Sequence, residues 1–156
     1  MRSFARKMRD YADDIPKQLN QIKQELAIEF ATEVVPATPV DTGRARGNWQ
    51  AGLSRRPVGE IVGVYGGRGG LNLGARGDSS IEQIRRVARA AKPRQRIYIT
   101  NNVPYIERLN DGYSNQAPKR FVQMALQRAR KTIDKQRIRY GGTSTGYRSQ
   151  VKVKLG

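Results

Sequence analysis

One apolar stripe runs along the first 35 residues and limits the possible folds more than any other feature. Its large side chains recur every three or four residues, at Phe4, Met8, Tyr11, Ile15, Leu19, Ile22, Leu26, Phe30 and Val34. This period predicts a helix with one buried face, from about Ser3 to Val35. Pro16 leaves two kinked helices as an alternative, and Pro36 and Pro39 are expected to end the element. We expect the stripe to pack onto the domain's own sheet; the alternative is a lever that reaches a neighbouring subunit.

The charge is large and unevenly distributed. The 156 residues include 30 Lys and Arg against 13 Asp and Glu, a net charge of +17. Residues 1–41 carry 6 basic and 7 acidic groups, residues 42–116 carry 13 and 5, and residues 117–156 carry 11 and 1. Such a field attracts nucleic acid, anionic lipid or acidic protein but does not specify a fold. The hydrophobic fraction of 37% predicts a modest core.

The chain contains neither cysteine nor histidine. Disulfides, thiolate metal sites, the usual zinc sites and histidine-based acid–base catalysis are therefore excluded. We expect no catalytic residue, no metal and no cofactor. No run of about 18 apolar residues and no signal-type segment is present, so we expect no membrane partner and a reducing, cytoplasm-like setting.

The middle of the chain predicts a small sheet. Residues 44–56 and 58–65 are interpreted as an antiparallel hairpin anchored by Trp49, and residues 96–101 form the clearest strand. Between them lies a glycine-rich loop, residues 66–78, which could cradle a phosphate but is interpreted as a loop that orders on assembly.

Three further helical segments follow from the pattern. One begins at Ser79 or Ser80, where Glu82 has capping-box spacing, and ends near Ala91. A helical turn is expected over residues 103–109, and a last helix from Pro118 to about Ile138. We divide the chain into one domain, residues 1–140, and a basic C-terminal segment, residues 141–156, which is either disordered or a strand that pairs with a partner.

Two short motifs suggest chemistry that their context does not support. Asp41-Thr42-Gly43 matches the aspartic-protease tripeptide, but arginines follow it directly and the apolar residues that embed that motif are missing. It is interpreted as a turn in which Asp41 caps backbone groups and Gly43 adopts a positive φ. Arg-Gly-Asp at 76–78 is interpreted as a chance match to the cell-adhesion tripeptide.

The basic residues have two interpretations, a solvated surface or a surface that contacts phosphates. Aromatic residues do not alternate with the arginines as they would on a base-stacking platform, so duplex backbone or an acidic protein ring fits better. The candidate contacts to DNA or an acidic partner are Arg55, Arg56, Arg85, Arg86, Arg89, Lys152 and Lys154.

Two segments in a fixed order carry a family resemblance. They are Thr-Pro-Val-Asp-Thr-Gly-Arg-Ala-Arg-Gly-Asn-Trp at 38–49 and Val-Pro-Tyr-Ile-Glu-Arg-Leu-Asn-Asp-Gly-Tyr-Ser-Asn-Gln-Ala-Pro-Lys-Arg-Phe-Val at 103–122. Together with the flanking helices they resemble the neck and tail-completion proteins of long-tailed bacteriophages, the group that includes the minor tail protein Z of lambda-like phages. The resemblance spans residues 3–138. It implies architectural turns at Asp41, Thr42, Gly43 and Arg44, and at Tyr105, Leu109 and Gly112.

The resemblance also implies a fold and a role. The fold is α+β, a small antiparallel sheet flanked by the long first helix and the last helix. The role is a virion protein of the head–tail junction or the top of the tail, made in the host cytoplasm. A homomeric ring, hexamer or dodecamer, would join the DNA-filled head to the tail and continue the DNA channel. Its neighbours would be head-completion or stopper proteins and tail-terminator or tail-tube proteins, with genomic duplex bound non-specifically. The alternative is a stand-alone basic nucleic-acid-binding protein, packaging-associated or ribosome-like; an enzyme is the third possibility.

Overall fold

The computed structural model describes residues 4–62 and 77–135, and its longest element is the first helix. Helix α1 is continuous from Phe4 to Ala37 and contains both Pro16 and Pro36. The alternative of two helices is therefore wrong. A proline inside a helix leaves the carbonyl four residues earlier without its donor, and for Pro16 this is the carbonyl of Ala12, an exposed residue that water can reach. Pro36 lies within the last turn and does not end the helix.

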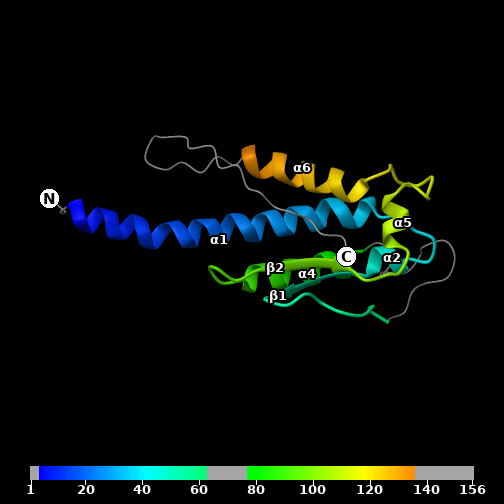
Figure 1. The fold of residues 1–156 in the computed structure, drawn as a ribbon, viewed down its shortest axis with the longest axis horizontal. Helices are drawn as coiled ribbons and strands as arrows, with labels where there is room; N and C mark the ends of the chain where they lie inside the picture. Colours follow the sequence, from blue (N-terminus) through cyan, green and yellow to red (C-terminus); the bar gives the residue numbers. More distant parts are fainter. Residues whose placement is uncertain (1–3, 63–76, 136–156) are drawn as a thin grey trace.

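The stripe of α1 packs mainly against two other helices. Helix α1 lies between α6, Phe121–Lys135, on one side and α4, Asp78–Ala90, with the sheet on the other (Figure 1). The expectation that the stripe packs onto the sheet is thus wrong, because α4 supplies most of that surface. The buried core contains Phe30, Ala31, Val34, Val35, Trp49, Ile84, Val103, Ile106, Phe121, Val122, Ala125 and Ala129.

The sheet has two antiparallel strands, but they are distant in sequence. Strand β1, Trp49–Leu53, pairs with β2, Ile97–Asn101, with Trp49 opposite Asn101. The predicted hairpin between residues 44–56 and 58–65 is therefore wrong over the described residues. The outer edge of β1 is occupied by a side chain of α4: Gln83 accepts from the Ala51 N–H at 2.9 Å and donates to the Ala51 carbonyl at 3.0 Å. The anchoring role of Trp49 is confirmed, since only 2% of it is exposed.

Helices α5 and α6 lie close to where they were predicted: α5 spans Ile106–Asn110, and α6 begins at Phe121, three residues after Pro118. Helix α2, Arg44–Gly47, was not predicted, because residues 44–56 were interpreted as a strand. Helix α4 begins after Gly77, whose φ is +76°, and has no side-chain cap. The predicted capping box of Ser79 and Glu82 is wrong, because the helix already begins at Asp78 and Ser79 lies inside its first turn. Ser80 donates to the Gly47 carbonyl at 2.9 Å.

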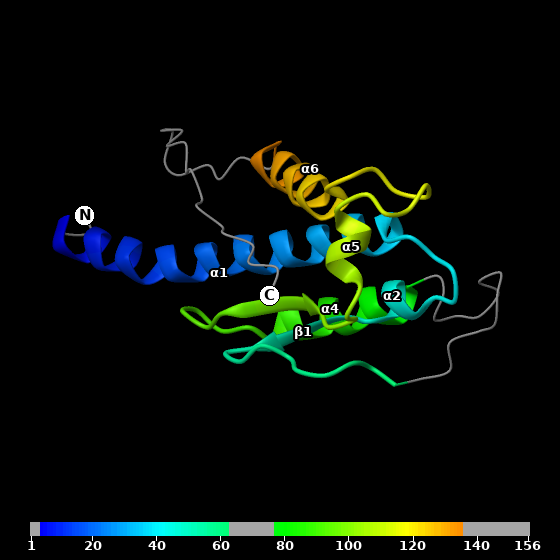
Figure 2. The same ribbon diagram turned by 45° about the vertical axis from the view of Figure 1, so that its right-hand side comes forward.

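The described elements make an α+β fold, which confirms the predicted fold class (Figure 2). Residues 63–65 of the predicted hairpin, residues 66–76 of the glycine-rich loop, residues 136–138 of the last helix and residues 141–156 lie outside the described residues. No described helix is both long enough and apolar enough to cross a membrane.

Candidate functional site

The N-terminal half of α1 carries the largest exposed apolar feature of the described structure. Residues 4–19, which we call the arm, project beyond the other elements (Figures 1 and 2). The exposed fractions of the stripe side chains in the arm are Phe4 79%, Met8 52%, Tyr11 51%, Ile15 46% and Leu19 42%. Four turns of amphipathic helix thus present their apolar face to solvent, which marks an interaction surface.

The arm leaves the domain where polar side chains of α1 bind the end of α4. Asn20 Nδ2 donates to the Ala91 carbonyl at 2.8 Å, and Lys23 Nζ donates to the carbonyls of Lys92 at 3.0 Å and Gln95 at 2.6 Å. Burial lowers the pKa of Lys23. Ala91, Lys92 and Gln95 follow α4, which ends at Ala90, so these bonds fix the base of the arm against the connection from α4 to β2.

The first predicted turn, Asp41 to Arg44, connects α1 to α2. Gly43 has a φ of +84°, and the Thr42 hydroxyl accepts from the Arg44 N–H at 3.5 Å. Asp41 is exposed, and α2 has no side-chain cap, so the capping expected of Asp41 is not formed there. Arg44 instead binds the Glu60 carboxylate through two bonds of 2.8 and 2.9 Å.

The residues after this turn tie α1 to the sheet. Arg46 donates to the carbonyls of Pro36 and Thr38, each at 2.8 Å, and so caps the C-terminal end of α1. Burial lowers the pKa of Arg46. Trp49 Nε1 donates to the Thr38 hydroxyl at 2.8 Å. The rings of Trp49 and Phe30 pack edge-on, with their centres 6.2 Å apart. These side chains thus join helix α1, the turn and strand β1.

The second predicted turn leads from α5 to α6. Tyr105 lies under the Arg44 guanidinium, 5.9 Å from the ring centre, which brings the two turns together. Leu109 packs against the core, and Gly112 has a φ of +95°. Asn110, which was not among the candidate residues, is buried and its Oδ1 accepts from the Val122 N–H at 3.1 Å, at the start of α6.

The candidate basic residues fall into three groups. Arg86 and Arg89 are exposed on α4, whereas Arg85 is bound to Glu82 at 2.7 Å. Arg55 and Arg56 are exposed just after β1. Lys152 and Lys154 lie outside the described residues.

Three further basic residues, Lys92, Arg94 and Arg96, lie in the connection from α4 to β2 and were not among the candidate contacts. All three are exposed, and a hydrogen bond with Tyr98 raises the pKa of Arg96. The Ser54 N–H donates to the Arg96 carbonyl at 2.9 Å. The residue after Ser54 is Arg55, so this candidate lies next to a point where the chain is bonded to the connection. The signal in the sequence was the alternation of basic residues between two predicted elements.

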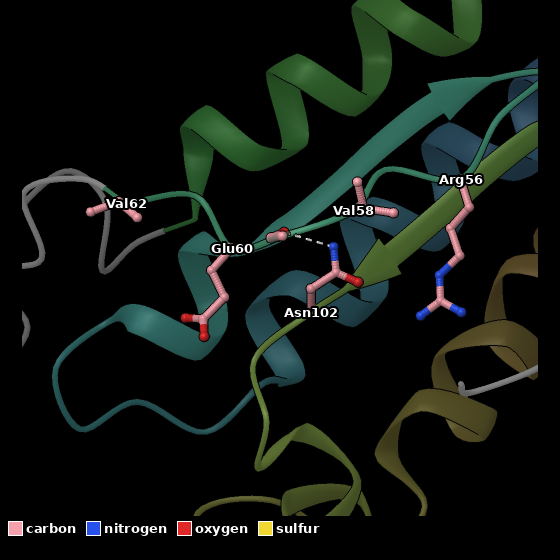
Figure 3. Close-up of a pocket in the computed structure, with 6 residues that line it drawn as sticks. Arg56, Val58, Glu60, Val62 and Asn102 are labelled. Carbon is pink, nitrogen blue, oxygen red and sulfur yellow. Dashed lines mark hydrogen bonds between the residues drawn. The ribbon is translucent and has the colours of Figure 1, made fainter.

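An open hollow of about 470 Å³ lies beside the segment that follows β1 (Figure 3). Its lining consists of Arg56, Val58, Gly59, Glu60, Val62 and Asn102. The carboxylate in this lining, Glu60, is already bound by Arg44. Within residues 4–62 and 77–135, no three acidic side chains gather to hold a metal ion. The lining offers apolar and polar contacts but no arrangement for acid–base chemistry.

A family model described as "Bacteriophage HK97-gp10, putative tail-component" matches residues 2–112. The match includes the arm, both strands and both turns, and stops before α6. No curated protein and no solved structure matches the chain. The resemblance to phage tail-completion proteins is thereby confirmed: the chain belongs to the HK97-gp10-like family of bacteriophage tail components.

Proposed function

We propose that the protein is a structural subunit of the head–tail junction of a long-tailed phage. Copies form a homomeric ring that joins the DNA-filled head to the tail and continues the DNA channel. The observation that carries the proposal is the arm, an apolar helical face left exposed in a member of a phage tail-component family. An apolar face of this length needs a protein partner, and in a ring each subunit can supply it to the next.

The role is structural rather than catalytic. The side chains with short polar contacts, such as Arg44 with Glu60 and Arg46 with Thr38, connect elements of the fold. The sequence offers neither a thiol nor an imidazole. These features support a protein that acts through its shape and its surfaces.

The basic surface supports contact with DNA in the channel. Arg86, Arg89 and Arg94 are exposed, and no carboxylate of the described residues forms an ion pair with them. Arginines that reach phosphates release counterions, so the binding depends steeply on salt and little on sequence. Such weak, sequence-independent attraction suits a channel through which the genome must slide.

Electron microscopy of a lysate from a phage with this gene inactivated tests the joining role. We expect DNA-filled heads beside separate, complete tails, and re-expression of the protein should restore joined particles. Complete particles in the lysate, or heads that lack DNA, would contradict the proposal.

The exposed arginines of α4 favour a second candidate, a stand-alone nucleic-acid-binding protein. The two candidates differ in assembly and in affinity: a ring subunit binds DNA weakly and assembles, whereas a dedicated binder binds tightly as a monomer or dimer. Sedimentation and DNA titration of the isolated protein distinguish them.

Reversing the charge of Arg85, Arg86 and Arg89 to Glu tests the DNA contact itself. We expect weaker DNA binding and a salt slope whose magnitude falls by about 0.9 for each phosphate that the protein no longer neutralises. A matched control reverses three exposed charges at or just before α6, Lys119→Glu, Arg120→Glu and Lys131→Glu, and α6 lies on the other side of α1 from α4 (Figure 1). If the α4 variant binds as the parent does, α4 does not contact DNA.

A further inference from the structure

The segment of residues 57–62 forms no strand in the described structure, yet neighbouring side chains fix its backbone. Asn102 Nδ2 donates to the Gly59 carbonyl at 2.8 Å (Figure 3). The Ile61 N–H donates to Asn48 Oδ1 at 2.7 Å. Because Asn48 and Asn102 adjoin the ends of the two strands, the segment is held to the rigid part of the domain.

This fixed segment presents apolar side chains to solvent. The exposed fractions are 88% for Val58, 40% for Ile61 and 95% for Val62. We call these three residues the apolar patch. Val58 and Val62 also line the hollow of about 470 Å³ described above. A single exposed valine is ordinary, but a group of apolar side chains on an anchored segment is typical of a protein-binding surface.

The arm and the patch are both apolar surfaces that the described structure leaves exposed. The arm presents a helical stripe of five large apolar side chains, and an amphipathic helix in an apolar groove is a common form of protein recognition. Residues 4–19 extend about 24 Å at 1.5 Å per residue, long enough to cover the patch and the hollow beside it.

Charge favours the arm of a second copy, rather than its basic body, as the occupant. The arm carries four basic and three acidic groups, whereas residues 42–116 carry 13 and 5. Two copies of a protein with a net charge of +17 repel each other, and the repulsion is smallest where the nearly neutral arm of one copy, with its carboxylates at Asp10, Asp13 and Asp14, meets the basic body of the next. Arg55 and Arg56, which directly precede the patch, belong to that basic body.

The positions of the two surfaces determine the kind of assembly. The arm projects at one end of the molecule, and the segment after β1 runs towards the opposite end (Figures 1 and 2). A head-to-tail contact between two such different surfaces leaves an arm and a patch free on every growing assembly until a ring closes, whereas two copies that exchanged arms reciprocally would stop at a dimer.

We propose that the arm of one copy docks on the apolar patch and hollow of the next copy, and that this contact builds the ring. The proposal rests on the proposed function and specifies which surfaces meet. It predicts a head-to-tail contact between different surfaces, and it excludes pairing of one arm with another.

Cross-linking tests the contact, and the absence of cysteine from the sequence makes it selective. The variant Tyr11→Cys/Val62→Cys, treated with a short bismaleimide, should give a ladder of covalent oligomers that ends at the ring. The variants Tyr11→Cys and Val62→Cys alone should remain uncross-linked. Sedimentation of the untreated parent protein shows whether the isolated subunits form a ring. Cross-linking of the double variant in assembled particles shows whether a ring is present there.

The outcomes separate this contact from the ring itself. A ring without an 11-to-62 ladder overturns the contact and leaves the proposed function standing. Covalent dimers from Tyr11→Cys alone mean that arms pair with arms, which also overturns it. A protein that forms no ring and no ladder, either isolated or in particles, contradicts both proposals.

A pair of substitutions in the arm gives a second test. Tyr11→Glu and Lys17→Gln each lower the net charge by one, but only Tyr11 belongs to the apolar stripe. We expect Tyr11→Glu to weaken assembly about 30-fold, the effect typical of a buried aromatic anchor, and Lys17→Gln to change it little. Equal effects of the two substitutions would overturn the proposal.

Discussion

The two halves of α1 share one helix and one stripe but have opposite surroundings. In the C-terminal half, Phe30, Val34 and Val35 are buried against α4 and α6. In the arm, Phe4 and Tyr11 continue the same stripe and remain exposed. The period of a stripe therefore indicates that a face will be covered, but does not say whether the cover belongs to the same chain.

The two halves of the helix therefore contribute to different free energies, the buried half to folding of the subunit and the arm to assembly. The buried half stabilises the subunit, since its side chains leave water when the chain folds. The arm gains little from its own subunit, because an exposed helix of about 16 residues is only marginally stable in water. Its apolar side chains can contribute to stability when copies assemble, so substitutions in the two halves should affect different measurements.

The largest expected difference compares Phe30→Ala with Tyr11→Ala. Phe30 is 7% exposed and packs edge-on against Trp49, whereas Tyr11 is 51% exposed. Phe30→Ala should lower the free energy of unfolding by about 3–5 kcal/mol, and Tyr11→Ala should change it by no more than about 0.5 kcal/mol. Urea denaturation of the isolated subunit measures both. Similar losses would mean that the arm is packed even without a partner.

The next comparison separates crowding from backbone strain at two glycines. Gly77 has a φ of +76°, and a Cβ there would lie 2.2 Å from a methyl carbon of Val35, in the buried half of α1. Gly59 has a φ of +79° with no atom within 4 Å of a Cβ. Alanine at either site costs about 1–2 kcal/mol for the left-handed backbone, and at Gly77 crowding adds about 1–3 kcal/mol.

Thermal or urea unfolding of Gly77→Ala and Gly59→Ala gives the two costs. The excess at Gly77 measures how tightly α4 approaches the buried half. Equal costs at the two sites would indicate that the start of α4 can move away from α1, so that this packing is loose.

Local patterns in the sequence were sufficient to predict most of the elements. The period of three and four predicted α1, and the run of β-branched and aromatic residues Ile97, Tyr98 and Ile99 predicted β2. The proline rule failed at Pro16 and Pro36, because exposed or terminal positions of a helix tolerate the lost hydrogen bond.

Strand pairing was not predictable in the same way. Residues 58–65 have the composition of a strand, but β1 pairs with residues 97–101, far along the chain. The choice depends on Gln83, whose amide occupies the outer edge of β1, and on Asn48, which binds the backbone of Ile61. Neither contact has a signature at short range in the sequence.

The candidate site was predictable only in part. The positive φ values at Gly43 and Gly112 follow from turn chemistry, and the arginines of α4 follow from the helical period. The exposure of the arm was not decided by the sequence, because a stripe looks the same whether α6 or another subunit covers it. Arg94 was missed because it lies between the predicted elements, and Arg96 because it was assigned to the predicted strand, residues 96–101.

The smallest expected effect concerns the proline of the arm. Pro16→Ala restores the backbone donor to the Ala12 carbonyl and removes a residue that is about 3 kcal/mol less favourable than alanine inside a helix. Because the apolar side chains before Pro16 are exposed, the gain should stay local: helicity at 222 nm should rise, while the free energy of unfolding changes by less than about 0.5 kcal/mol. Lys17→Ala is the control, since lysine and alanine differ little in helix propensity. If Pro16→Ala stabilised the whole subunit by about 3 kcal/mol, the arm would fold cooperatively with the body, and the division of α1 into a subunit half and an assembly half would be wrong.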